Sequence, residues 1–359
     1  DILTGSLTGS IIYGLAGNDV IKASAGNNTI IGGEGNDELY GGSGSDRFVF
    51  TGNWGNDILY DNENEQGQTS GKGGHTLDFS GVTANLTLTF DKIGSFDTLI
   101  VVGGTNRLSY ESLFPGILKA VYAGSGNDMF ILNGLSNERT ASLYGGAGDD
   151  RFILAHRAKS KGTLDGGSGS DRIDFSSWTD VIDVVLTGLG ATDGFNGQAN
   201  DPAAIEKLIL NFQNINLLTG SSSAGKDSLT GMNTASVFRL GTQADNGATE
   251  YENGGRILSF TGFEALRGGS AADTFEVRGA KAYDLYGGGG NDVFRFKDGA
   301  VLTGIVDGEG GSNTLDLSDY IADLIVGLTD TGTTAGFTGK AGLGDLLTEI
   351  AGFTNIGTI

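Results

Sequence analysis

The 359-residue sequence contains no cysteine, two prolines and two histidines. The absence of cysteine excludes a disulfide framework and thiolate metal sites. No run of about 18 apolar residues is present, so we expect no insertion into a membrane. Because the chain has two histidines and no H-E-x-x-H motif, it has little scope for histidine-based catalysis, and we expect it not to be an enzyme.

Glycine is the abundant residue, with 64 copies. So much glycine with so little proline is typical of a repeat protein and not of a packed globule. The formal net charge is −22. An acidic chain lacks the basic footprint that nucleic-acid binding requires, so we expect no nucleic-acid partner.

Residues 14–49 form a nonapeptide repeat, GLAGNDVIK, ASAGNNTII, GGEGNDELY and GGSGSDRFV. The shared pattern is G-G-x-G-x-D-x-U-x, where U is a large apolar residue, and it is that of a calcium-binding β-solenoid. Glycine at the first, second and fourth places permits a positive-φ turn that directs carbonyl oxygens inward. Aspartate at the sixth place adds a carboxylate, and such oxygen ligands suit calcium. The apolar residue then begins a short strand with its side chain inward.

Two nonapeptides make one coil, so turns on one edge recur about every 18 residues and stack at roughly 4.8 Å. The sixth-place residues expected on the first edge are Asp19, Asp37 and Asp57, followed by His75. Those expected on the second, weaker edge are Ser10, Asn28 and Asp46. The best ion sites should lie between neighbouring aspartates of the first edge. His75 is interpreted as a replaced turn residue in preference to a transition-metal ligand.

These repeats resemble those of the repeats-in-toxin (RTX) family of secreted bacterial proteins. The resemblance implies an all-β fold, a right-handed parallel β-roll or β-solenoid with calcium bound in Gly-Asp-rich turns. Several calcium ions are the implied cofactors. About ten bound ions would nearly cancel the net charge, which predicts that ion binding is a condition of folding.

Later turns come once per coil, which predicts calcium in single file. Asp128, Asp150 and Asp171 are 22 and 21 residues apart, and Asp273, Asp292 and Asn313 are 19 and 21 apart. The expected calcium-binding residues are therefore Asp19, Asp37, Asp57, Asn28, Asp46, Asp128, Asp150, Asp171, Asp273, Asp292 and Asn313. The glycines expected to supply the curved, carbonyl-presenting backbone are Gly17, Gly33, Gly35, Gly42, Gly44, Gly146, Gly148, Gly167, Gly169, Gly288 and Gly290.

A longer repeat overlies the short one. Asp78, Asp174 and Asp316 each stand in an apolar-Asp-apolar-Ser sequence that ends a run of turns. We interpret each as an outward side chain that supports a junction turn, in preference to a set of carboxylates acting on sugars. One continuous solenoid is expected. Its predicted parts are a regular β-roll at 1–80, a module at 81–176 with calcium turns at 123–175, a longer module at 177–318 with calcium turns at 268–316, and the start of a further module at 319–359.

Two hypotheses of function follow. The first is a calcium-stabilised extracellular structural protein of the bacterial cell surface, part of an adhesin, surface layer or filament, which folds on calcium binding after secretion. The alternative is the RTX secretion and folding module of an exported lipase, protease or polysaccharide epimerase. Asp1 already falls in repeat register, so we expect the chain to be a segment of a longer one. Its expected partners are calcium and either further repeats of the same chain or identical subunits end to end.

Overall fold

A computed structural model describes residues 1–6, 9–60, 74–93, 96–113, 118–133, 140–203, 206–241, 249–343 and 349–359. The described residues form strands, turns and loops without a helix, so none of them belongs to a helix that could cross a membrane. The polar stretch at 61–70 and residues 134–139, for both of which the sequence predicts loop, lie outside these ranges.

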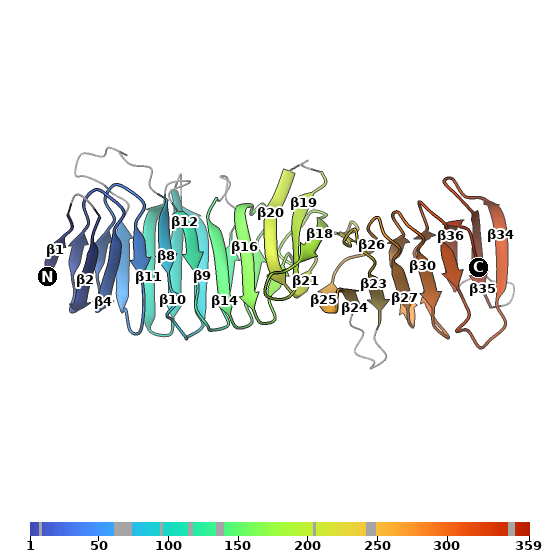
Figure 1. Cartoon of the computed structure of the whole chain (residues 1–359), viewed down its shortest axis with the longest axis horizontal. Coiled ribbons are helices and arrows are strands. Elements are labelled where there is room, and N and C mark those ends of the chain that lie inside the picture. The colour runs from blue at the N-terminus through green and yellow to red at the C-terminus, as the bar shows by residue number, and fades with distance from the viewer. Residues whose placement is uncertain are drawn as a thin grey trace. The chain divides into compact units, whose positions relative to one another are not determined.

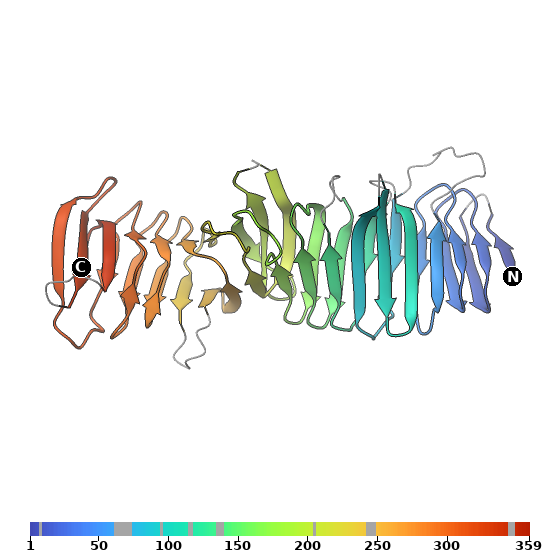
Figure 2. The ribbon, with the colours of Figure 1, turned by 180° about the vertical axis from the view of Figure 1, so that it is seen from behind.

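The chain divides into two compact units. Unit 1 comprises Asp1–Trp178 and Lys207–Ile215, and unit 2 comprises Thr179–Glu206 and Asn216–Ile359. Seen from opposite sides in Figure 1 and Figure 2, each unit consists of successive short strands joined by turns. The predicted all-β solenoid fold is confirmed by this arrangement, in which most strands pair in parallel.

Unit 1 contains two sheets, between which the strands largely alternate along the chain. The first sheet contains β1 (Ile2–Thr4), β3 (Val20–Lys22), β5 (Glu38–Tyr40), β7 (Asn56–Tyr60), β9 (Leu86–Ile93), β10 (Phe96–Gly103), β11 (Asn106–Leu113), β13 (Met129–Leu132), β15 (Arg151–Leu154) and β17 (Arg172–Asp174). The second sheet contains β2 (Ile11–Ala16), β4 (Thr29–Glu34), β6 (Arg47–Val49), β8 (His75–Asp78), β12 (Leu118–Tyr122), β14 (Ser142–Ala147), β16 (Ser160–Ser168) and β20 (Glu206–Ile215). At the start of the chain, Leu3 pairs with Ile21 and Ile12 with Ile30, which is the coil spacing that the nonapeptides predict.

An antiparallel meander interrupts the first sheet of unit 1. Strand β10 pairs with both β9 and β11 in antiparallel fashion, while β11 lies parallel to β7 and β9 parallel to β13. In the second sheet β8 and β12 pair directly. The meander therefore adds strands to one sheet only, which the nonapeptide pattern does not predict.

Unit 2 also contains two sheets. The first contains β21 (Leu217–Thr219), β23 (Val237–Leu240), β24 (Thr249–Asn253), β25 (Arg256–Thr261), β27 (Thr274–Val277), β30 (Val293–Phe296) and β33 (Thr314–Asp316). The second contains β18 (Asp183–Leu189), β19 (Phe195–Asp201), β22 (Ser228–Thr230), β26 (Ala265–Arg267), β28 (Ala280–Lys281), β29 (Asp284–Tyr286), β31 (Val301–Leu302), β32 (Val306–Asp307), β34 (Ile325–Thr331), β35 (Phe337–Gly342) and β36 (Ile350–Ile356). Strands β23, β24 and β25 repeat the meander of unit 1, with β25 parallel to β21 and β23 parallel to β27.

Equivalent side chains of successive coils stack on one another inside each unit. The ring centroids of Phe130 and Phe152 are 4.7 Å apart, and those of Phe275 and Phe294 are 5.0 Å apart. All four rings are fully buried. Stacking of like side chains is what regular coils with inward apolar residues predict, and these narrow aromatic columns hold the turns at a fixed spacing.

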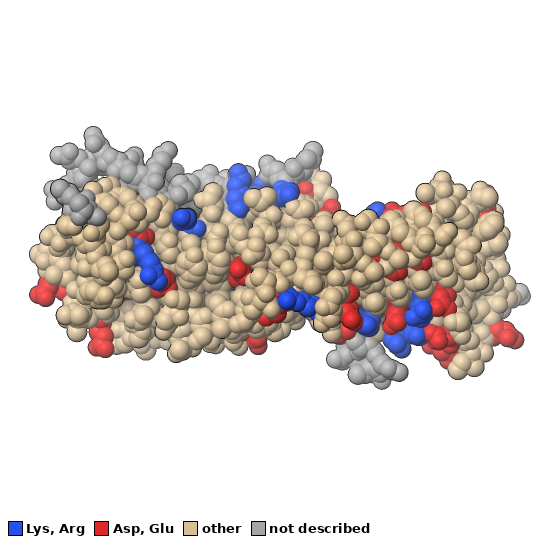
Figure 3. Space-filling model, in the orientation of Figure 1, with Lys and Arg blue, Asp and Glu red and all other residues tan. Residues whose placement is uncertain are grey.

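Charged side chains on the outer surface pair with one another. In unit 2, Lys297 contacts Asp319 at 2.7 Å and Arg295 contacts Asp316 at 2.8 Å. On the face shown in Figure 3, acidic and basic side chains of this unit lie side by side. The carboxylates of the turns are different, because they are buried.

Candidate calcium-binding turns

The predicted turn glycines adopt the backbone conformation that was expected of them. All of those named above have positive φ; Gly35, for example, has φ +134° and Gly146 φ +107°. In this region a side chain would be strained, so glycine is favoured. The stacking is also close, because a Cβ on Gly44 would lie 2.7 Å from the carbonyl carbon of Gly26, one coil before.

The sixth-place aspartates stack through a ladder of hydrogen bonds. The backbone N–H of Asp19 donates to Oδ1 of Asp37 at 2.8 Å, and that of Asp37 to Oδ1 of Asp57 at 2.9 Å. The later turns form the same ladder, in the pairs Asp128–Asp150, Asp150–Asp171, Asp273–Asp292 and Asp292–Asn313, at 2.7 to 2.9 Å. One oxygen of each carboxylate is thus used by the turn of the preceding coil.

The prediction that His75 continues the Asp57 edge is wrong. The backbone N–H of Asp46 donates to Nδ1 of His75 at 3.1 Å, so His75 follows Ser10, Asn28 and Asp46 on the other edge. Asp46 and His75 are 29 residues apart, and the extra length includes residues 61–73. The spacing of 18 from Asp57 was a coincidence, because an insertion had changed the length of the coil.

The second carboxylate oxygen has no hydrogen-bond partner in several of these turns. It is buried and without a hydrogen-bond partner in Asp19, Asp37, Asp57, Asp150 and Asp292, whereas Oδ2 of Asp46 lies 3.4 Å from Nδ1 of His75. An ionised carboxylate in such a place is strongly unfavourable unless a cation compensates it. Burial raises the pKa of Asp57 and Asp292 to about 7 and that of Asp150 to about 8. The neighbouring aspartates in the stack contribute to these raised pKa values, because like charges oppose ionisation.

The first-place glycines have a different role from the one predicted. Gly14, Gly32 and Gly41 do not have positive φ. A Cβ at Gly14 would lie 2.7 Å from Oδ2 of Asp19 and would also overlap the carbonyl oxygen of Gly32. All three positions require glycine because an aspartate Oδ2 lies against them, and at Gly14 a carbonyl oxygen of the next coil lies there as well.

The oxygen atoms that the turns present are therefore suitable ligands for calcium. Within the described residues, no group of three or more acidic or histidine side chains is arranged to hold a metal ion by itself. Each site would consist of carboxylate oxygens from stacked aspartates completed by backbone carbonyls, and oxygen-only ligands suit a hard cation. Such an ion would neutralise the buried charges that the turns bring together.

A second ladder, which sequence reasoning missed, runs beside the first. In several turns the side chain of the residue before the sixth place accepts a backbone N–H from the next coil: Asn18 from Asn36 at 2.9 Å, and Asn36 from Asn56 at 2.8 Å. Asn127 and Asp149 act in the same way. The signal was visible in the sequence as recurring Asn-Asp and Asp-Asp pairs at the fifth and sixth places.

In four of the predicted ligands, the second polar atom of the side chain already has a hydrogen-bond partner within the protein. Oδ2 of Asp128 accepts the N–H of Gly124 at 3.1 Å, and Oδ2 of Asp273 accepts that of Gly269 at 2.8 Å. Each of these two aspartates begins a file of turns that follows a meander. Asn28 and Asn313 present an amide nitrogen where the aspartates present Oδ2.

The junction aspartates bind arginine and backbone. Asp78 pairs with Arg47, and Asp174 pairs with Arg151. Asp174 also accepts the N–H of Ser176 at 2.8 Å. Hydrogen bonds from Ser318 and Arg295 lower the pKa of Asp316 to about 2. These contacts agree with the interpretation of the three residues as supports of the junction turn, but Asp78 and Asp174 are buried and not outward as expected.

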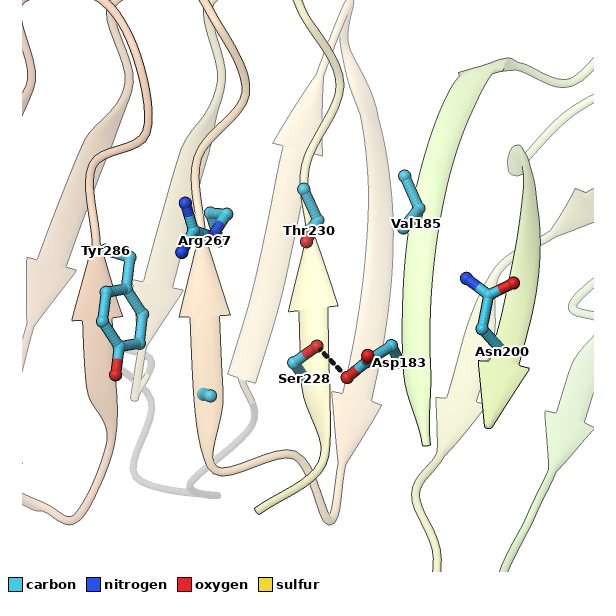
Figure 4. A pocket seen from close by; sticks show the side chains of 8 residues that line it. Asp183, Val185, Asn200, Ser228, Thr230, Arg267 and Tyr286 are labelled. Atoms are coloured by element: carbon cyan, nitrogen blue, oxygen red, sulfur yellow. Dashed lines mark hydrogen bonds between the residues drawn. The ribbon is translucent and has the colours of Figure 1, made fainter. Parts of the chain in front are cut away.

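A shallow polar groove lies on the outer face of the second sheet in unit 2 (Figure 4). Its volume is about 420 Å³, and its lining includes Asp183, Asn200, Ser228, Arg267 and Tyr286. Ser228 donates a hydrogen bond to Asp183 at 2.6 Å. Asp183 is the one carboxylate among the lining residues, so the groove does not hold the carboxylate pair that glycoside hydrolysis uses.

The sequence model of one protein family matches the chain. It is described as the RTX calcium-binding nonapeptide repeat (4 copies), and it matches residues 13–48, 142–154 and 284–300. These ranges contain the turns of Asp19, Asp37, Asp46, Asp150 and Asp292. No curated protein was found to match the chain.

Proposed function

Because this chain carries RTX nonapeptide repeats, which bind several calcium ions per array, we propose that it is a calcium-stabilised structural segment of a secreted bacterial surface protein. In this proposal it forms part of an adhesin, a surface layer or a filament. Its ends join further repeats of the same chain or identical subunits. The proposal is supported above all by the stacked, buried carboxylate oxygens that lack a partner.

The proposed ions act on folding and not on a substrate. Each would replace repulsion between stacked carboxylates by attraction, and each would join one coil to the next. The binding free energy of an ion whose site does not exist in the unfolded chain becomes folding free energy. A chain of net charge −22 would gain more from this than a neutral one.

Calcium dependence of this kind suits a secreted protein. Extracellular calcium modules bind with dissociation constants of about 10⁻⁴–10⁻³ M. Such a chain stays unfolded where calcium is scarce and folds where it is plentiful. Secretion in the unfolded state followed by folding outside the cell is therefore part of the proposal.

Circular dichroism tests the calcium dependence. In a chelator at about pH 8, where the buried carboxyl groups tend to ionise, the chain should give a coil spectrum, and added calcium should produce β-structure with a midpoint at about 0.1–1 mM. Magnesium should be ineffective, because it demands compact octahedral sites and keeps its waters. An identical β-spectrum in chelator and in calcium would refute the proposal.

Electron microscopy of the calcium-loaded chain tests the structural role. Single particles would favour a segment of a longer chain, whereas fibres would favour a self-assembling subunit. Enzymatic turnover by the calcium-loaded chain would contradict both.

A further inference from the structure

Asn28 holds its turn together with its own side-chain amide. Its Nδ2, which carries two hydrogens, lies within hydrogen-bonding distance of four oxygens. They are the carbonyl oxygens of Ser24 at 3.2 Å, Gly26 at 3.0 Å and Gly41 at 3.5 Å, and Oδ1 of Asp46 at 2.9 Å. The carbonyls come from the second and fourth places of its own nonapeptide and from the first place of the nonapeptide one coil on. Carbonyls at these places are the ones that would face an ion in an aspartate turn.

The orientation of this amide is fixed by the coil before it. Oδ1 of Asn28 accepts the backbone N–H of Ser10 at 2.8 Å. If the amide were turned over, its NH₂ group would face that N–H and its oxygen would face the carbonyls. Both contacts would be repulsive, so the hydrogen-bond network selects a single orientation.

Asn313 repeats the arrangement in unit 2. Its Oδ1 accepts the N–H of Asp292 at 2.9 Å, while its Nδ2 donates to the carbonyl oxygens of Gly308 at 2.7 Å and Asn355 at 3.2 Å. Asn28 is 2% exposed and Asn313 is fully buried. Neither turn leaves a buried polar atom of the asparagine without a partner.

We propose that the amides of Asn28 and Asn313 take the place of a calcium ion, so that these two turns close without metal. The inference rests on the proposed function, because it assumes that the aspartate turns bind calcium. The N–H groups of the asparagine amide place partial positive charge against the oxygens that an ion would otherwise bind. Because the amide is neutral, the turn contains no buried carboxylate charge that a cation must neutralise. The sequence-based prediction that Asn28 and Asn313 are calcium ligands is then replaced, and each unit contains a turn that an asparagine closes without calcium.

Exchange of the amide for a carboxylate tests this directly. Asn28→Asp keeps the acceptor for the Ser10 N–H and restores an unpartnered Oδ2, so the variant should bind one more calcium ion than the wild type. Asn313→Asp should behave in the same way in the other unit. Asn28→Ala is the matched control. It removes the amide without supplying a carboxylate, and it should leave the ion count unchanged while it lowers the unfolding temperature.

The ions are counted by native mass spectrometry of the full chain in saturating calcium, after circular dichroism has shown that each variant is folded. A gain of one ion in both aspartate variants supports the proposal. An unchanged count in these folded variants would overturn it, and so would the loss of an ion from Asn28→Ala or, if that variant does not fold, from Asn313→Ala. Failure of the proposed function is seen separately, as a wild-type chain that binds no calcium.

Discussion

Asp37 is the position at which a single substitution should remove the most calcium. Its Oδ1 accepts the N–H of Asp19, and its own N–H donates to Oδ1 of Asp57, so it lies between two stacked turns. Its Oδ2 is buried without a partner, and burial raises the pKa of the carboxyl group. Asp37→Asn keeps the acceptor for the Asp19 N–H and replaces Oδ2 by an amide. We expect the variant to lose about two ions, one on each side of Asp37.

The size of the effect depends on free calcium. At 100 times its dissociation constant, each ion stabilises the fold by about 2.7 kcal/mol, so two lost ions cost about 5 kcal/mol. When calcium is scarce the variant should be more stable than the wild type, because it no longer buries an unpaired carboxylate. Each ion bound on folding adds about 1.4 kcal/mol of stability per tenfold rise in free calcium. The slope for Asp37→Asn should therefore be smaller than that of the wild type by about 2.8 kcal/mol per decade.

Urea unfolding at a series of buffered calcium concentrations measures this slope. The wild-type and variant stabilities should cross, with the wild type more stable at high calcium. Ser10→Ala is the control, because Ser10 has no carboxylate, and its slope should equal that of the wild type. Parallel lines for Asp37→Asn and the wild type would show that the Asp37 carboxylate does not bind calcium.

Three further predictions concern the pH dependence of the calcium-free fold, the room available at a first-place glycine and a junction aspartate. Because burial raises the pKa of Asp150 from 3.8 to about 8, the calcium-free fold is favoured by protonation; its β-signal in circular dichroism should fall as the pH rises from about 4 to about 8. Gly32→Ala brings a methyl group to 3.1 Å from the carboxylate carbon of Asp37. This variant should lose about 1–3 kcal/mol of stability and at least one bound calcium ion. Gly188→Ala is the control, because its methyl group meets no atom within 4 Å, and it should change stability by less than about 0.5 kcal/mol. Asp174→Ala removes the partner of Arg151 and should cost about 1–3 kcal/mol in urea unfolding with the calcium count in native mass spectrometry unchanged.

Local features of the turns could be predicted from the sequence because they depend on a few neighbouring residues. A positive-φ glycine such as Gly35 is required by the shape of one turn, whatever its neighbours in space. The stacking of Asp19 on Asp37 follows from a coil of constant length. Both inferences needed the repeat period and nothing more.

Pairing between distant segments could not be predicted in this way. The nonapeptide pattern contains no signal for the meander β9–β11, because alternating apolar residues suit parallel and antiparallel neighbours alike. The edge on which His75 lies depends on the length of an inserted segment, and the spacing between repeat residues does not show how long that segment is. The amide of Asn28 differs from a carboxylate by one atom, and its effect becomes apparent only when the carbonyls around it are seen.

The ladder of sixth-place side chains also has a direction. Each Oδ1 accepts an N–H from the preceding coil, as Asp171 does from Asp150 and Asp150 does from Asp128. A substitution that removes this oxygen therefore leaves a buried N–H unsatisfied in the coil before it and not in the coil after it, at a cost of about 1–3 kcal/mol. Asp150→Ala should accordingly loosen the turn of Asp128 more than that of Asp171, whereas Asp150→Asn should not. Amide hydrogen exchange in saturating calcium measures this difference at the backbone N–H of Asp128, and equal protection of that N–H in the two variants would show that the ladder carries no such direction.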